Sequence, residues 1–82
     1  MEKSIHSQYY GVFLNLKQYR RKAALTQIQL AEKLGETQTF VSKCERGERR
    51  IDVIELRTFC EAFGISLSQF STRLEREIRR LR

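Results

Sequence analysis

The sequence predicts an all-α fold, and three observations lead to that prediction. The 82 residues include no proline and only four glycines. No run of alternating apolar and polar residues, bounded by turn clusters as strands usually are, is apparent. Helix-capping residues precede each of the amphipathic segments that follow Leu25. We therefore expect an all-helical domain.

Length and charge favour a small basic domain. A chain of 82 residues is expected to form one domain with a modest core. Residues 1–8 lack periodicity and are predicted to form a mobile arm, and residues 9–82 to form the domain. The net charge of +6 favours a polyanionic partner such as nucleic acid. A basic surface without any partner is the plain alternative.

Composition also sets several function classes aside. No stretch approaches the ~18 apolar residues of a membrane span, and residues 1–8 lack an apolar signal-peptide core, so we expect a cytoplasmic protein. Cys44 and Cys60 fall at predicted core positions and are interpreted as small buried hydrophobes, with a disulfide as the minor alternative. One histidine makes a zinc site unexpected. No catalytic constellation is apparent, so we expect no enzyme activity, no cofactor and no small-molecule ligand.

The first helix is predicted from Tyr9 or Tyr10 to Ala23. Its apolar stripe follows helical spacing and consists of Val12, Leu16, Tyr19 and Ala23. Arg20 lies at the border of this stripe. A long cation at such a place must extend to solvent or meet a carboxylate.

The segment from Gln27 to Arg46 predicts two short helices joined by a tight turn. Thr26 and Gln29 have the spacing of a capping box that opens the first of these helices. Gly35 follows where a left-handed residue is needed to end it. Thr37 can then cap the second helix through its hydroxyl oxygen.

The second helix of this pair is predicted to carry a compact polar face. At about 100° per residue, one side presents Gln38, Thr39, Ser42 and Lys43. Val41 and Cys44 lie on the opposite, apolar side. Amide, hydroxyl and ammonium groups are those that pair with base edges in the DNA major groove. The alternative is an ordinary amphipathic helix pair whose polar face is only solvated.

A basic loop and two more helices complete the chain. Arg49 and Arg50 lie in the loop that follows Gly47. Asp52 and Glu55 form a second capping-box spacing and open a helix that ends at Gly64. The residues expected to fill one side of that helix are Val53, Leu56, Phe59, Cys60 and Phe63, whereas Ile54 is expected to point away from them.

The last helix is predicted to extend over residues 66–82, opened by Ser66 and Gln69. Its apolar stripe, only about 80° wide, consists of Leu67, Phe70, Leu74, Ile78 and Leu81. A stripe this narrow is typical of a packing seam. We therefore expect a symmetric homodimer whose interface uses Ile54, Leu74, Ile78 and Leu81. The alternative is that the helix folds back on its own bundle.

The stretch LTQIQLAEKLGETQTFVSKCERGERRID, residues 25–52, resembles a known family. It is similar to the small helix-turn-helix domains of phage repressors and Cro proteins, also called the XRE type. The combination TQ-x-x-LA-x-x-LG followed by TQ-x-x-VSK-x-E-x-G carries the resemblance, which covers roughly two-thirds of the chain. It implies a lambda-repressor-like bundle of five helices, here with an extended C-terminal helix.

The resemblance also implies residue roles. Gln38, Thr39, Ser42 and Lys43 match positions that contact DNA bases, and Ser42 could instead contact phosphate. The positions that match phosphate contacts are Thr26, Gln27, Arg49 and Arg50. Arg20 and Glu45 match a structural ion pair. The sequence departs from the family pattern at Glu36, Cys44 and Phe40, and Phe40 is expected to cover the edge of the core rather than contact a thymine methyl group.

The expected function is that of a transcriptional regulator, encoded by a bacterium or a phage. It would bind a pseudo-palindromic site in double-stranded DNA as a dimer and act as a repressor. Two alternatives stay open. One is the antitoxin of a toxin–antitoxin pair, which binds a protein partner and represses its own operon. The other is the controller protein of a restriction–modification operon.

Overall fold

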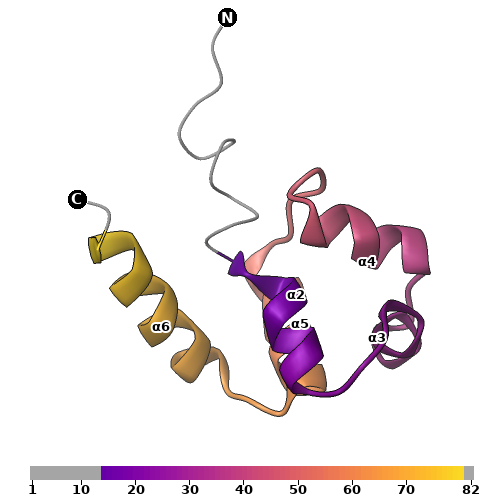
Figure 1. Ribbon diagram of the computed structural model, residues 1–82, viewed down its shortest axis with the longest axis horizontal. Coiled ribbons are helices and arrows are strands. Elements are labelled where there is room, and N and C mark those ends of the chain that lie inside the picture. Colours follow the sequence, from indigo (N-terminus) through magenta and orange to yellow (C-terminus); the bar gives the residue numbers. More distant parts are fainter. Residues whose placement is uncertain (1–13, 81–82) are drawn as a thin grey trace, which may run out of the picture.

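The computed structural model describes residues 14–80, and within that range every regular element is a helix. The helices are α2 (Leu16–Lys22), α3 (Gln27–Leu34), α4 (Gln38–Glu45), α5 (Val53–Phe63) and α6 (Leu67–Arg80). Helices α2 and α5 lie in the middle of the molecule, with α3 and α4 on one side and α6 on the other (Figure 1). The predicted all-α fold is confirmed. The predicted arm, residues 1–8, lies outside the described residues.

Local capping interactions determine where most of these helices begin and end. Three capping boxes, Thr26–Gln29, Asp52–Glu55 and Ser66–Gln69, have both of their reciprocal hydrogen bonds. The Thr37 hydroxyl accepts from the backbone N–H of Phe40 and caps α4. Gly35 and Gly64 end α3 and α5 in the left-handed conformation, with φ of 71° and 80°. The predicted boundaries around residues 26–66 are confirmed.

The first predicted helix is interrupted at Asn15, since Leu14 before it and Leu16 after it are both helical. Asn15 adopts a left-handed conformation with φ 53°, and α2 begins only at Leu16. An asparagine tolerates this conformation because its short polar side chain can bond locally, and it interrupts a helix there. The Asn15 amide donates to Gln18 at 3.3 Å. The remaining predicted part, from Tyr9 or Tyr10 and including Val12, lies outside the described residues.

The core joins all five helices. Its buried apolar members are Leu14, Leu16, Leu30, Ala31, Val41, Cys44, Phe59, Cys60, Phe63 and Phe70. An aromatic series crosses it, from Phe40 on α4 through Phe59 and Phe63 on α5 to Tyr19 on α2 and Phe70 on α6, with ring centroids 5.1–6.3 Å apart. Phe40 thus packs on the edge of the core, as expected.

One expected core residue proves to be exposed. Val53 is the first residue of α5, and 60% of its surface is accessible. It lies roughly 70° around the helix from the centre of the buried face formed by Phe59, Cys60 and Phe63. The first turn of α5 therefore leaves it in solvent beside Ile54, which is 70% exposed.

Helix α6 divides into two parts. Its first turns belong to the bundle, since Phe70 is buried and Leu67 and Leu74 pack against the core. Ile78 is half-buried and lies one turn further along, outside that cluster of described residues. Of the helices in residues 14–80, none is long and apolar enough to cross a membrane.

Candidate nucleic-acid interface

A shallow depression lies where α3 and α4 meet, and it gathers most of the predicted base-contacting side chains. It measures about 290 Å³ and is lined by Gln27, Gln38, Thr39, Ser42 and Arg46. Gln27 begins α3, and the other four lie on or directly after α4, at positions that share one helical face. The lining side chains are all polar and carry both hydrogen-bond donors and acceptors. Such a surface can pair with base edges or with phosphate.

Gln27 and Gln38 are joined directly, which sequence reasoning did not foresee. Gln38 Nε2 donates to Gln27 Oε1 at 3.2 Å. Gln27 Nε2 in turn donates to Glu45 Oε1 at 3.0 Å. Gln27 therefore connects the first residue of α4 with the last one, across the turn of the helix pair. The side chains of Gln27, a predicted phosphate contact, and Gln38, a predicted base contact, are thus hydrogen-bonded to each other.

Glu45 also meets Arg20, the cation at the border of the α2 stripe. Arg20 Nε lies 2.6 Å from Glu45 Oε2, and the two side chains are only 10% and 4% exposed. Arg20 Nη1 donates to the carbonyl of Leu25 at 2.9 Å. Among the described residues no buried side-chain nitrogen or oxygen lacks a partner. This pair fastens α4 to α2 with its polar groups satisfied, which is what makes a buried charge tolerable.

Arg46 is a residue of the depression that the sequence reading missed. Its guanidinium donates to the Ser42 hydroxyl and, through Nε, to Glu48 Oε2 at 2.8 Å. Glu48 raises the pKa of Arg46 by this hydrogen bond, and Arg46 lowers the pKa of Glu48 in the same way. Its i, i+4 spacing from Ser42 was the available signal. Arg46 adds the positive charge that the predicted set lacked inside the depression.

The Arg49 guanidinium contacts two groups, the Phe40 ring and the Glu55 carboxylate. Its guanidinium carbon lies 4.7 Å from the centre of the Phe40 ring, and Nη2 lies 3.1 Å from Glu55 Oε2. The hydrogen bond to Glu55 raises the pKa of Arg49. Glu55 is also the capping-box residue of α5. The loop after α4 is thereby tied to both neighbouring helices, while 42% of the Arg49 side chain still faces solvent.

The remaining predicted contacts do not line this depression. Lys43 and Arg50 are exposed, on α4 and in the following loop. The Lys43 carbonyl accepts the backbone N–H groups of Glu48 and Arg49, which orders that loop. Thr26 is exposed at the N-terminus of α3, where its hydroxyl is used as a cap. The structure therefore gathers Gln27, Gln38, Thr39 and Ser42 in one place, whereas Thr26, Lys43, Arg49 and Arg50 are not part of its lining.

The two cysteines lie on the inner faces of α4 and α5. Both are buried and free, so the minor disulfide alternative is wrong. Burial raises the pKa of the Cys44 thiol to about 11. Burial likewise raises the pKa of Cys60. In residues 14–80 no three His, Cys, Asp or Glu side chains gather as a metal site would require.

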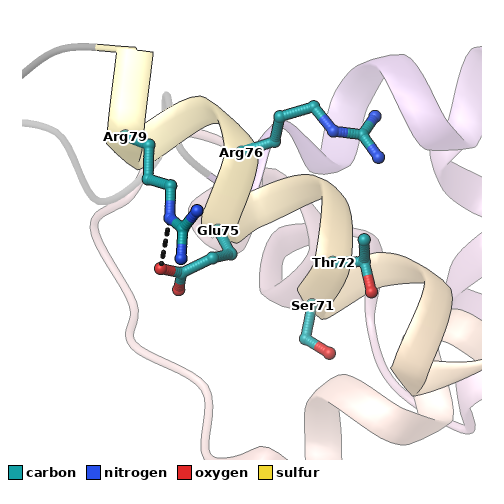
Figure 2. Close-up of a pocket in the computed structure, with 5 residues that line it drawn as sticks. All are labelled: Ser71, Thr72, Glu75, Arg76 and Arg79. Carbon is teal, nitrogen blue, oxygen red and sulfur yellow. Dashed lines mark hydrogen bonds and ion pairs between the residues drawn. The ribbon is translucent and has the colours of Figure 1, made fainter.

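A second depression, of about 470 Å³, lies on the polar side of α6 (Figure 2). It is lined by Ser71, Thr72, Glu75, Arg76 and Arg79. Glu75 and Arg79 pair with each other at 3.3 Å, and the Ser71 hydroxyl donates to carbonyls of its own helix. All its residues come from one exposed helix face, so it has the features of a solvated surface.

Comparisons with known proteins agree on the fold. A family model described as helix-turn-helix matches residues 16–70. No curated protein matches the chain. Among solved structures, an XRE-family like protein from Pseudomonas syringae pv. tomato str. DC3000 is 42% identical, with a TM-score of 0.78 over 89% of this chain and 90% of that one.

Two other solved structures are similar to this chain. A point mutant of the restriction-modification controller protein C.Esp1396I is 29% identical, with a TM-score of 0.75 and 95% of each chain covered. The clp gene regulator ClgR from C. glutamicum is 21% identical, with a TM-score of 0.70 and 92% of each chain covered. At that lower identity ClgR shows the fold alone. The matched family segment contains every residue of the depression between α3 and α4.

Proposed function

Since this chain belongs to the XRE-type helix-turn-helix family, we propose that it is a DNA-binding transcriptional regulator that recognises a specific double-stranded sequence. We further propose that it acts as a repressor and binds a pseudo-palindromic operator as a homodimer. The family, with its regulator relatives, supports the general role. The repressor action and the dimer rest on the arguments below.

The observation that carries the proposal is the polar depression at the junction of α3 and α4. Gln38, Thr39 and Ser42 project from one face of α4, and Arg46 continues that face with a positive charge. An α-helix fits the major groove, where amides pair with adenine, cations with guanine and hydroxyls with several bases. We propose that this face, with Lys43 beside it, contacts base edges. Thr26, Gln27, Arg49 and Arg50 would position the domain on the phosphate backbone.

The dimer is proposed from apolar surface that the bundle leaves accessible. Val53 and Ile54 are 60% and 70% exposed at the start of α5. Helix α6 packs on α5 and carries Ile78 beyond the core. Leu74 lies at the core edge, and Leu81 lies outside the described residues. A two-fold dimer through this side would bring two recognition helices to half-sites about 34 Å apart.

We propose repressor action because of the kind of surface that residues 14–80 present. The helices of residues 14–80 form one bundle, and the two depressions described above are open and lined by polar or charged residues, unlike most small-molecule sites. A bound dimer of this kind can act by occupying a promoter. Transcription from a promoter that contains the selected site should therefore decrease when the protein is present, and an increase would contradict the assignment.

A second candidate is supported by one of the similar structures. The restriction-modification controller protein C.Esp1396I is 29% identical over 95% of each chain. This chain could therefore serve as such a controller. The sequence that it binds distinguishes the two roles: a controller would bind its site upstream of a restriction–modification operon, and a general repressor would bind elsewhere.

Selection of bound duplexes from a random DNA pool tests the proposal most directly. We expect enrichment of two inverted half-sites whose centres are separated by about one turn of DNA. Enrichment of one half-site only would contradict the dimer. Affinity that is equal for all duplexes and falls steeply with salt would contradict sequence recognition.

A further inference from the structure

Two arginines that follow α4 are each paired at two points with a glutamate. Arg46 donates to Glu48 through Nε at 2.8 Å and through Nη2 at 3.2 Å. Arg49 donates to Glu55 through Nη1 at 3.2 Å and through Nη2 at 3.1 Å. A guanidinium uses the same two-point geometry when it binds a phosphate group. The two carboxylates therefore engage the N–H groups that a phosphate would need.

The stretch of residues 46–55, which contains the loop that the sequence suggested to be basic, carries equal numbers of arginines and carboxylates. Its charged members are Arg46, Glu48, Arg49, Arg50, Asp52 and Glu55. The excess positive charge of the chain, +6 overall, thus does not come from this stretch. Its attraction for DNA depends on whether its arginines keep or leave their carboxylate partners.

We propose that Glu48 and Glu55 compete with DNA for Arg46 and Arg49, and that this competition lowers the affinity of the protein for DNA. The inference rests on the proposed function and adds a form of regulation to the same surface. On binding, each guanidinium exchanges a carboxylate for hydrogen-bond acceptors of the DNA. The affinity is reduced in proportion to the fraction of free protein in which the arginine is available.

The two pairs can open at little cost, unlike the ion pair of the core. Arg46 and Glu48 are exposed, and Arg49 and Glu55 are half-buried. Ion pairs at a protein surface contribute a factor of about two to five to an equilibrium. The buried pair of Arg20 and Glu45 is expected to stay closed on DNA. The competition therefore weakens DNA binding severalfold without preventing it.

Glu48 gives the clearer test, because its partner lines the depression between α3 and α4. Arg46 is one of the lining residues, and its guanidinium also donates to the Ser42 hydroxyl. The Glu48 carboxylate is thus hydrogen-bonded to a group of the proposed DNA surface. Removing the charge of Glu48 leaves this group available to DNA.

The experiment measures the affinity of Glu48→Gln for a duplex of random sequence at about 0.1 M salt. Glutamine keeps the size of the side chain and removes the charge that holds the guanidinium, so this variant should bind about threefold more tightly than the wild-type protein. Glu55→Gln should show a similar gain. Glutamine also fits that position of a capping box, so α5 keeps its cap. An unchanged or lower affinity in either variant would overturn the inference for that pair.

A double variant separates competition from plain repulsion between a carboxylate and DNA. In an Arg46→Met background, Glu48→Gln has no guanidinium to release, so its gain should disappear. A gain that persists there would show repulsion alone and overturn the competition. Glu32→Gln is the matched control, because Glu32 is exposed on α3 and forms no ion pair within residues 14–80. It changes the net charge equally and should change the affinity by less than about 1.5-fold.

A second duplex, the selected operator, assigns the DNA group that replaces Glu48. An equal gain on the operator and on random DNA assigns Arg46 to phosphate, and a larger gain on the operator assigns it to a base edge. A wild-type protein that binds DNA, with no gain in Glu48→Gln or Glu55→Gln, would overturn this inference alone. A wild-type protein that binds no duplex would overturn the proposed function and this inference together.

Discussion

The two sides of the molecule differ in how their polar side chains are hydrogen-bonded and in how much apolar surface the core leaves uncovered. On the α3–α4 side, exposed amides are held by hydrogen bonds that lead back to the buried Arg20–Glu45 pair. On the α6 side, the ion pairs Glu75–Arg79 and Glu77–Arg80 each join neighbours on the same exposed helix, while Ile78 stays half-buried beyond the core. The first surface is already ordered for a partner, which lowers the entropic cost of binding. The second has apolar area that another surface could cover.

The largest expected effect comes from breaking the buried ion pair. Glu45→Gln or Arg20→Met should lower the free energy of unfolding by about 3 kcal/mol or more, because the remaining group is left without its partner in a dry site. Urea denaturation monitored by circular dichroism measures this. The double variant should recover part of the loss.

The matched control for that prediction lies on α6. Arg79 and Glu75 form an i,i+4 pair at 3.3 Å, with side chains 76% and 63% exposed. Arg79→Met should change the free energy of unfolding by less than about 0.5 kcal/mol. Equal losses from the buried and the exposed pair would contradict the difference drawn between the two sides.

The next effect concerns Ile78, the half-buried apolar residue of α6 that lies beyond the core. Ile78→Lys should weaken the proposed homodimer by about 3 kcal/mol, because each interface would lose two buried isoleucines. Analytical ultracentrifugation should then show a folded monomer at concentrations where the wild-type chain is dimeric. Ser68→Lys, at an exposed position of the same helix, is the control. A dimer that survives Ile78→Lys would place the interface elsewhere.

Smaller effects distinguish base contacts from phosphate contacts. Gln38→Ala should lose about 1–3 kcal/mol on the preferred operator and little on random DNA. Arg49→Ala should weaken both complexes and lower the salt dependence by roughly one charge. Gel-shift titrations at several salt concentrations measure both. Equal losses on the two duplexes would remove Gln38 from the base contacts.

The effect that is smallest at neutral pH concerns the inner face of α4. Burial raises the pKa of the Cys44 thiol from 9.0 to about 11. At pH 8 the thiolate fraction of Cys44 is therefore roughly a hundredfold smaller in the folded chain than in the unfolded chain. Below pH 9 the thiol is protonated in both states and stability is unaffected; above it the unfolded chain ionises first, so stability should fall until about pH 11. Comparing denaturation of wild type and Cys44→Ala across this range isolates the contribution. A slope that Cys44→Ala leaves unchanged would contradict it.

The sequence by itself determined the helix boundaries from Thr26 onward. The capping pair Thr26–Gln29 and the left-handed Gly35 act within three or four residues of the chain, so their effect does not depend on the rest of the fold. The polar face of α4 was predictable for the same reason, since helical periodicity alone places Gln38 and Ser42 together. The family motifs added the expectation that this face meets DNA.

The tertiary structure decided what depends on segments that are distant in the sequence. Arg20 and Glu45 are 25 positions apart, and Gln38 and Gln27 are 11 apart. Helical periodicity placed each of these residues on a face of its own helix. Only the packing of α3 against α4, and of α2 against α4, set the order of donors and acceptors between them. The same packing left Val53 exposed, because α5 turns its first residue away from the helices that cover Phe59.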